Sequence, residues 1–285
     1  MLQHVLFCSI WKILLIYVNK GLIWNKGGRG NNFLGGYKLP ESYEPPEVIE
    51  RTKGNEGELQ LQRRGAHFEL IYNGVFLMAT YNGSGEREMV QAALQPWDET
   101  RPGEHRPPFL RVLMGGLGFG LGLQELLRSP LVERVDLLEL EEAVIRWNRG
   151  VLQEVNGGAL EDARVHVYKE DLILFLQRGI KGKNRVHYHA IILDTDNGPD
   201  WLSRSANRLL YDMTGTTLLK EHIQPGGALS VWSASPVPEY HTLLQHHFPV
   251  VHEVSCLEKT GQSSYYYLAR KCEKKLDSWI VDGKR

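Results

Sequence analysis

From Phe109 onward, short apolar runs alternate with stretches of helical periodicity. The apolar runs are FLRVLM (109–114), RVDLLEL (134–140), RVHVY (164–168), AIILD (190–194), ALSVWS (228–233), VVHEVSCL (250–257) and SSYYYLAR (263–270). Helical stretches lie between the first six, at 120–128, 141–154, 171–177, 214–223 and 239–247. This alternation predicts an α/β fold with a doubly wound, mostly parallel seven-stranded sheet. Because no helix precedes the last run, we expect that strand to pair antiparallel at an edge.

The preceding residues, 41–108, have a different pattern. Strand-like runs at 58–63, 67–72 and 75–81 surround Asn73-Gly74, a two-residue turn typical of a β-hairpin. A loop with four prolines follows at 95–108. We therefore predict an N-terminal β-hairpin unit over 41–108, a Rossmann-like nucleoside-binding catalytic domain over 109–271 and a tail over 272–285.

Residues 1–40 contain an apolar run at 2–18 that Lys12 interrupts. The run is shorter than the span of about 20 apolar residues that a bilayer requires, and no cleavage site of the signal-peptide type follows it. We expect a disordered leader, or one that begins at a start codon placed too far upstream, and no membrane role. The three cysteines form no C-x-x-C pair, which fits a reducing cytoplasm. With a net charge of −1, the chain lacks the basic excess that nucleic-acid binding requires.

A glycine-rich segment, GGLGFGLG (115–122), follows the first apolar run directly. A strand, then glycines, then a helix is the arrangement in which a backbone turn approaches a nucleotide or nucleoside closely. The G-x-G-x-x-G spacing of dinucleotide sites is absent from this run, whereas Gly116, Gly118 and Gly120 give G-x-G-x-G, a spacing typical of S-adenosylmethionine sites. We predict that these glycines and Gly115 shape an adenosine site; a tight turn without a ligand is the alternative.

Acidic residues follow the next two predicted strands. Glu139 ends the second strand, where a carboxylate can accept hydrogen bonds from both ribose hydroxyls. Asp171 follows the third strand, where it can accept one from an adenine amino group. Ligands of doubly wound sheets bind at the carboxyl ends of the strands, so the three features together predict an adenosine-type ligand. Taken singly, each carboxylate also fits a solvated surface position.

The fourth predicted strand runs into D-T-D-N-G-P (194–199). Asn-Gly-Pro forces a sharp turn, so Asp194 and Asp196 can point into one cavity. Neighbouring carboxyl groups raise each other's pKa; one can then act as a general base on an amine while the other holds a cationic substrate. We predict both as catalytic residues. In the structural alternative, Asp194 caps the following helix and Asp196 makes a local turn.

These segments together resemble the spermidine synthase-like family of the class I S-adenosylmethionine-dependent transferase fold, over roughly residues 55–270. The matching segments are VLMGGLGFG, VDLLELEEAVIRWNRG, DARVHVYKEDLILFL, AIILDTDNGP and LLYDMTGTTLLKEHIQPGGALSVWSASP. The D-x-D-N-G-P loop is closest to a bacterial branch of that family. The resemblance implies that Glu139 binds ribose, Asp171 binds adenine and Asp194 is the catalytic acid/base.

The sequence also departs from the family pattern. The family has an aspartate within the glycine turn, where Gly118 or a neighbour stands here, and its gate loop is two residues longer. In the segment 74–88, Leu77 takes the place of a glutamine and Glu86 that of a tyrosine, while Glu88 corresponds to the family's glutamate. Glu88 is therefore the candidate substrate-binding residue from this segment. Tyr211 is a second candidate, with packing as its alternative.

The resemblance implies a transferase that binds S-adenosylmethionine or its decarboxylated form and moves an aminopropyl or alkyl group to a small-molecule amine. Methyl transfer on the same scaffold and a catalytically idle nucleoside-binding domain are the alternatives. We expect no metal, because His187, His189 and His246-His247 have no cysteine or acidic residue at zinc-like spacing. The resemblance also suggests a homodimer formed through the N-terminal β unit.

Overall fold

The computed structural model describes residues 33–34, 37–38, 45–98, 109–181 and 186–272. Nearly all of the predicted leader and tail lies outside these residues. The chain divides into two compact units, one of Met1–Lys53 and Gly57–Leu77, the other of Gly54–Glu56 and Met78–Arg285. Within the described residues, no helix combines the length and apolar character of a membrane span.

The first unit is built on antiparallel strands. The two-residue strands β1 (Phe33–Leu34) and β2 (Tyr37–Lys38) pair with each other. A four-stranded sheet has the order β3 (Glu47–Lys53), β4 (Glu58–Arg64), β5 (His67–Tyr72) and β6 (Val75–Ala79). Asn73 and Gly74 between β5 and β6 both have positive φ, 48° and 75°, as a type I′ turn requires. The predicted hairpin is confirmed.

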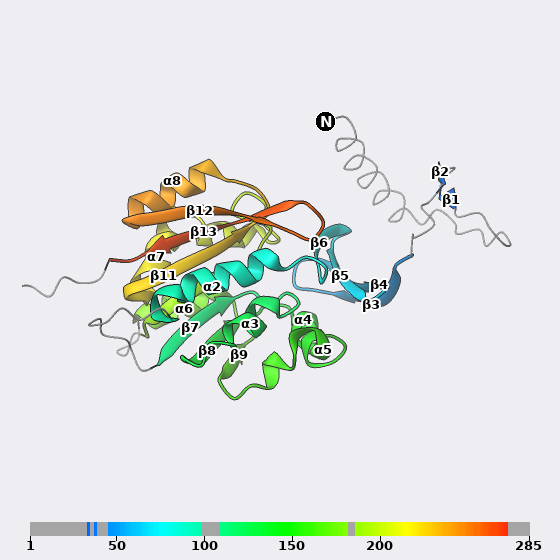
Figure 1. Cartoon of the computed structure of the whole chain (residues 1–285), viewed down its shortest axis with the longest axis horizontal. Helices are drawn as coiled ribbons and strands as arrows, with labels where there is room; N and C mark the ends of the chain where they lie inside the picture. Colours follow the sequence, from blue (N-terminus) through cyan, green and yellow to red (C-terminus); the bar gives the residue numbers. More distant parts are fainter. Residues whose placement is uncertain (1–32, 35–36, 39–44, 99–108, 182–185, 273–285) are drawn as a thin grey trace, which may run out of the picture. The chain divides into compact units, whose positions relative to one another are not determined.

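The second unit contains the predicted α/β sheet (Figure 1). Its seven strands have the order β12-β13-β11-β10-β7-β8-β9. The bounds are β7 (Leu110–Gly115), β8 (Val132–Leu138), β9 (Val165–Tyr168), β10 (Tyr188–Leu193), β11 (Ile223–Ser233), β12 (Val250–Leu257) and β13 (Ser263–Arg270). All pairings are parallel except those of β13, which is antiparallel to both neighbours.

The prediction that the last strand lies at an edge is wrong, because β13 lies between β11 and β12 and the edge strand is β12. Burial explains the order. Four consecutive residues of β13, Tyr266 to Ala269, are buried, as expected for a strand covered on both faces. By contrast, β12 has Cys256 as its one buried residue. The continuous apolar run YYYLA was the sequence signal for an interior strand.

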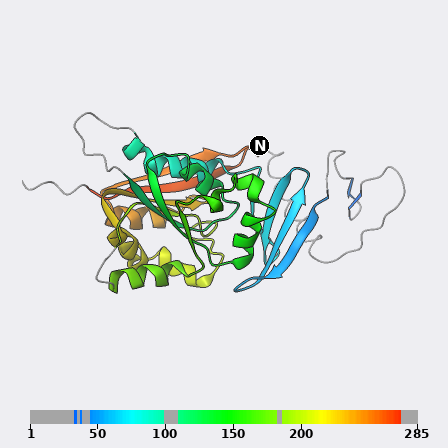
Figure 2. The ribbon, with the colours of Figure 1, turned by 90° about the horizontal axis from the view of Figure 1, so that it is seen from below.

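Helices cover both faces of this sheet. One set is α2 (Ser84–Asp98), α3 (Leu121–Leu126), α4 (Glu142–Arg149) and α5 (Gln153–Asn156). The other is α6 (Leu172–Lys181), α7 (Met213–His222) and α8 (Pro238–His247). Short 3-10 helices are η1 (Ala159–Glu161) and η2 (Ser205–Leu210). Figure 2 shows α2 on one side of the sheet and α6 and α7 on the other.

Helix α2 was not predicted, and it shifts the boundary between the units. Met89, Val90, Ala93 and Leu94 recur at helical spacing and are all buried. They pack α2 against α3 and the strands of the second unit. The first compact unit accordingly ends at Leu77 rather than at the predicted residue 108.

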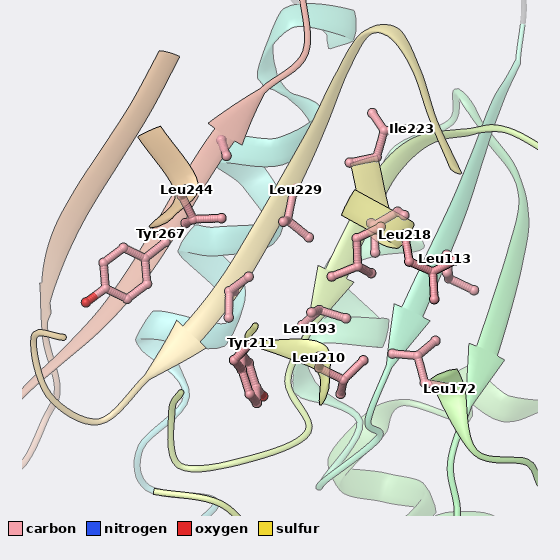
Figure 3. Close-up of a cluster of buried hydrophobic side chains, with 14 of the residues drawn as sticks. Leu113, Leu172, Leu193, Leu210, Tyr211, Leu218, Ile223, Leu229, Leu244 and Tyr267 are labelled. Atoms are coloured by element: carbon pink, nitrogen blue, oxygen red, sulfur yellow. The ribbon is translucent and has the colours of Figure 1, made fainter. Parts of the chain in front are cut away.

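The core between the sheet and α6, α7 and α8 holds the strand ends in place (Figure 3). Apolar side chains, most of them leucine and tyrosine, from five strands, three helices and η2 meet there. Those labelled in the close-up are Leu113, Leu172, Leu193, Leu210, Tyr211, Leu218, Ile223, Leu229, Leu244 and Tyr267. Because Leu193 and Leu113 lie near the ends of β10 and β7, this core fixes the loops that follow these two strands.

Candidate functional site

The glycine turn lies directly against the end of β10. Gly116 has φ +89°, and a Cβ atom there would lie 2.0 Å from the carbonyl oxygen of Asp194. The backbone N–H of Asp194 donates to Gly115 O at 2.8 Å, and that of Gly116 donates to Leu138 O at 2.9 Å. Only glycine permits this approach, so the turn, β8 and β10 form one rigid corner.

Two buried asparagines support the turn from α4 and α5. Asn148 Nδ2 donates to the carbonyl oxygen of Gly118 at 2.8 Å, and Asn156 Nδ2 donates to Asn148 Oδ1 at 2.9 Å. A Cβ atom at Gly120, where φ is +73°, would lie 2.8 Å from the Cβ of Asn156. The turn is therefore fixed from behind by side chains that the sequence pattern did not single out as its supports.

Glu139 lies at the predicted position, between β8 and α4. Its Oε2 accepts a hydrogen bond from Leu117 N at 3.0 Å and its Oε1 one from Glu141 N at 2.8 Å. Burial raises its pKa to about 7, although these hydrogen bonds oppose the rise. Each carboxylate oxygen keeps a second lone pair, so Glu139 can still accept from two hydroxyl groups.

Asp194 follows β10 and lies among other acidic groups. Its pKa is raised well above the usual value, first by burial and then by the charges of Glu86, Glu139 and Asp196. Among the described residues, no lysine or arginine forms an ion pair with Asp194, Glu139 or Glu86. We refer to Glu86, Glu139 and Asp194 as the acidic site.

Asp196, the second predicted catalytic residue, is engaged in hydrogen bonds within its own loop. Its buried carboxylate accepts hydrogen bonds from Ser203 N at 2.6 Å, Asn207 Nδ2 at 3.0 Å and Tyr211 OH at 2.8 Å. Further bonds come from the hydroxyl groups of Ser203 and Thr195. With its oxygens occupied, Asp196 holds the loop after β10 in shape. The Tyr211 hydroxyl is used in the same network, which fits the packing alternative rather than substrate binding.

Asp171 lies at the carboxyl end of β9, as predicted, and already has two partners. Its Oδ1 accepts from Leu174 N at 3.1 Å at the start of α6, and its Oδ2 accepts from Arg204 at 3.1 Å. Arg204 also pairs with Glu56 of the same compact unit at 3.0 Å. An adenine amino group at Asp171 would use a remaining lone pair or displace Arg204.

The structure does not bring Glu88 to the acidic site. Its side chain is exposed and accepts a weak hydrogen bond from Cys256 Sγ at 3.1 Å. Residues two apart on a helix face different directions, and Glu86 is the one on the buried side. Glu86 is 6% exposed and lies three and four residues before the buried Met89 and Val90. This helical spacing in the sequence already indicates that Glu86 lies on the buried side. The comparison of segment 74–88 with the family pattern did not use it and pointed to Glu88.

Glu258 fixes the start of α2. Its carboxylate accepts from the backbone N–H groups of Gly83, Ser84 and Gly85 at 3.0 to 3.1 Å and from Ser264 Oγ at 2.7 Å. Burial alone would raise its pKa, but these hydrogen bonds hold it below the usual value. Glu258 is thus an ionised group that sets the position of Glu86. Among the described residues, no cluster of three or more His, Cys, Asp or Glu is arranged to hold a metal ion.

Comparison with known proteins identifies the family. The spermine/spermidine synthase domain matches residues 102–255, more than half of the chain. The chain belongs to the spermine/spermidine synthase family. The match includes the glycine turn, Glu139, Asp171 and Asp194, so the resemblance found in the sequence is confirmed.

Individual relatives agree with this family. The chain is 35% identical over 126 residues to a polyamine aminopropyltransferase of Mycobacterium tuberculosis, a match that covers 44% of this chain and 23% of that protein. It is 27% identical over 164 residues to the polyamine aminopropyltransferase of Saccharolobus solfataricus, covering 58% and 50%. The chain thus spans about a quarter of the length of the mycobacterial relative and half that of the archaeal one.

Solved structures show the same fold. The crystal structure of spermidine synthase from Thermotoga maritima superposes with a TM-score of 0.61 at 19% identity, covering 79% of this chain and 72% of that one. A spermidine synthase in complex with the transition state analogue AdoDATO matches with the same TM-score at 18% identity. At these identities the likeness establishes the α/β fold of the family.

Proposed function

We propose that this protein is an aminopropyltransferase that takes decarboxylated S-adenosylmethionine as the donor and a small amine as the acceptor. The proposal rests on one observation above all. Three buried or half-buried carboxyl groups meet beside a glycine turn at the strand ends, and no cationic side chain among the described residues pairs with them. A donor with a sulfonium and an ammonium group, together with an amine acceptor, supplies that missing positive charge.

The glycine turn, Glu139, Asp171 and Asp194 each have a separate task in this proposal. The glycine turn lets the nucleoside lie close to the backbone at Gly116, and Glu139 accepts hydrogen bonds from the ribose hydroxyls. Asp171 accepts one from the adenine amino group. Asp194, at the end of β10, faces the reacting amine. Because the corner formed by the turn, β8 and β10 is rigid, most of the acceleration comes from positioning.

The transfer step is an in-line displacement. The amine nitrogen attacks the aminopropyl carbon bonded to the sulfonium sulfur, and an N–C bond forms as the C–S bond breaks. The electron pair of that bond returns to sulfur, which leaves methylthioadenosine as a neutral thioether. The proton that the amine loses passes to the carboxylate of Asp194.

The electrostatics of Asp194 suit this role. Burial and the neighbouring carboxyl charges raise its pKa, and a carboxylate with a raised pKa is a stronger base than an ordinary one. Positive charges on the bound donor and acceptor favour its ionised form.

Asp194→Asn tests the proposal. We expect turnover to fall by about 10²- to 10⁴-fold, the usual contribution of a general base, while donor binding changes much less. Asp200→Asn is the matched control, since Asp200 is an exposed aspartate of the same loop. Unchanged turnover in Asp194→Asn would remove Asp194 from the reaction.

A further inference from the structure

Glu86 is a buried carboxyl group that forms no ion pair with another described residue. It lies in the first turn of α2, where a Cβ atom built at Gly83 would be 3.9 Å from its Oε2 and 2.5 Å from Leu121 Cδ1 of α3. Leu121 directly follows the glycine turn. Glu86 therefore lies where α2 crosses the start of α3, beside the proposed nucleoside site, and its charge acts on Asp194.

The charged groups around Glu86 do not neutralise it. Glu258 is acidic and is occupied by the N-terminus of α2. Among the described residues, Arg87 is the cation that acts on Glu86, but its guanidinium donates to Leu121 O at 3.3 Å and Gln124 Oε1 at 3.1 Å. Asp194 is a second carboxyl group without a cationic partner among the described residues. Burial is the largest cause that raises the pKa of Glu86, to about 7.

A buried carboxylate is costly unless it is paired and hydrogen-bonded. Glu258 shows how this protein satisfies such a group when its purpose is structural, with four hydrogen-bond donors around it. Glu86 accepts a hydrogen bond from its own backbone N–H, and among the described residues no other side chain donates one to it. The contrast between two neighbouring glutamates points to a partner that arrives with the substrates.

From this placement we infer that Glu86 binds a primary ammonium group of a substrate held beside Asp194. The inference rests on the proposed function and assigns this chain's amine recognition to α2 rather than to the exposed Glu88. The ammonium has two chemical sources, the aminopropyl end of the donor and the acceptor amine. Both are primary ammonium groups of a cationic substrate, and binding experiments separate them.

The experiment compares ligands that share the nucleoside and differ in the ammonium. Calorimetry at pH 8 measures three affinities. They are those for decarboxylated S-adenosylmethionine, for methylthioadenosine, and for putrescine added to the methylthioadenosine complex. We expect Glu86→Gln to weaken one of the two amine-bearing ligands by about tenfold or more, as for loss of a charge-assisted hydrogen bond. Methylthioadenosine should bind about as before. Loss with the donor assigns Glu86 to the donor, and loss with putrescine assigns it to the acceptor.

Glu88→Gln is the matched control on the same helix and should bind all three ligands as the wild type does. The inference is overturned if Glu86→Gln keeps both amine affinities, or if it loses methylthioadenosine binding by the same factor. Should Glu86→Gln not fold, the wild-type protein gives a second measurement. Its preference for the amine-bearing ligand should strengthen as the pH rises through 7, and a preference independent of pH overturns the inference.

These experiments can overturn the ammonium site and the proposed transferase function independently of each other. If the wild type discriminates ammonium ligands through Glu86 but releases no methylthioadenosine, the transferase proposal fails and the ammonium site stands. If the wild type turns over and Glu86→Gln matches it in binding and in kcat/KM, the ammonium site fails and the transferase proposal stands.

Discussion

Replacing Glu86 by glutamine should stabilise the unliganded protein above neutral pH, although it removes a native side chain. The pKa of Glu86 rises from 4.5 to about 7 in the folded protein, chiefly because the group is buried. Between these two values the folded state binds more protons than the unfolded chain. The free energy of unfolding therefore decreases as the pH rises through this window, and the full destabilisation is present above pH 7.

The size of the effect follows from the shift. One pKa unit corresponds to about 1.4 kcal/mol, so the shift of Glu86 gives an upper limit of about 3 kcal/mol at pH 8. Relaxation around the charge and partial hydration reduce this, and we expect a gain of about 1 to 3 kcal/mol for Glu86→Gln. At pH 4 both side chains are neutral, and the two proteins should be nearly equal in stability.

Urea unfolding at a series of pH values measures this directly, with Glu88→Gln as the exposed control on the same helix. The difference between Glu86→Gln and wild type should grow from near zero at pH 4 to its full value at pH 8. A difference that does not change with pH, or a variant less stable than wild type at pH 8, would refute the conclusion that Glu86 carries an uncompensated buried charge.

Three further changes test the corner of the proposed nucleoside site. Gly116→Ala should destabilise the fold or abolish methylthioadenosine binding, because its Cβ would lie 2.0 Å from the carbonyl oxygen of Asp194; a normal melting temperature with normal binding would contradict this. Asn148→Ala should cost about 1 to 3 kcal/mol in urea unfolding, since it leaves the half-buried carbonyl of Gly118 without its donor. Arg204→Gln frees Asp171 and should tighten binding of methylthioadenosine but not of its inosine analogue, as measured by calorimetry; equal effects on both ligands would argue against adenine recognition by Asp171.

Much of the fold could be predicted from the sequence, because the patterns that determine it lie within short contiguous segments. The buried runs of β7, β8 and β10 and the glycines after β7 are contiguous, and each dictates its own structure. The prediction that Glu139 and Asp194 lie at one edge of the sheet uses the same local signals, since parallel strands bring their carboxyl ends to one edge. The position of β13 could not be predicted in this way, because the order of strands depends on which surfaces remain to be covered.

Side-chain roles were harder to predict than side-chain positions. Asp196 lies where the sequence places it, but its role depends on Ser203, Asn207 and Tyr211, which come from later in the chain. Glu86 and Glu88 were distinguishable only after α2 was recognised as a helix, because helical spacing decides which of the two is buried. Comparison with the family's motif alone pointed to Glu88, whose side chain is exposed.

The most direct test of the account identifies the nucleoside that the wild-type protein releases. The protein is incubated with decarboxylated S-adenosylmethionine and a panel of amines, and in parallel with S-adenosylmethionine and the same panel. We expect methylthioadenosine from the decarboxylated donor, in one-to-one ratio with an aminopropylated amine, and no product from the second donor. S-adenosylhomocysteine from the second donor, or no nucleoside product from either despite donor binding, would contradict it.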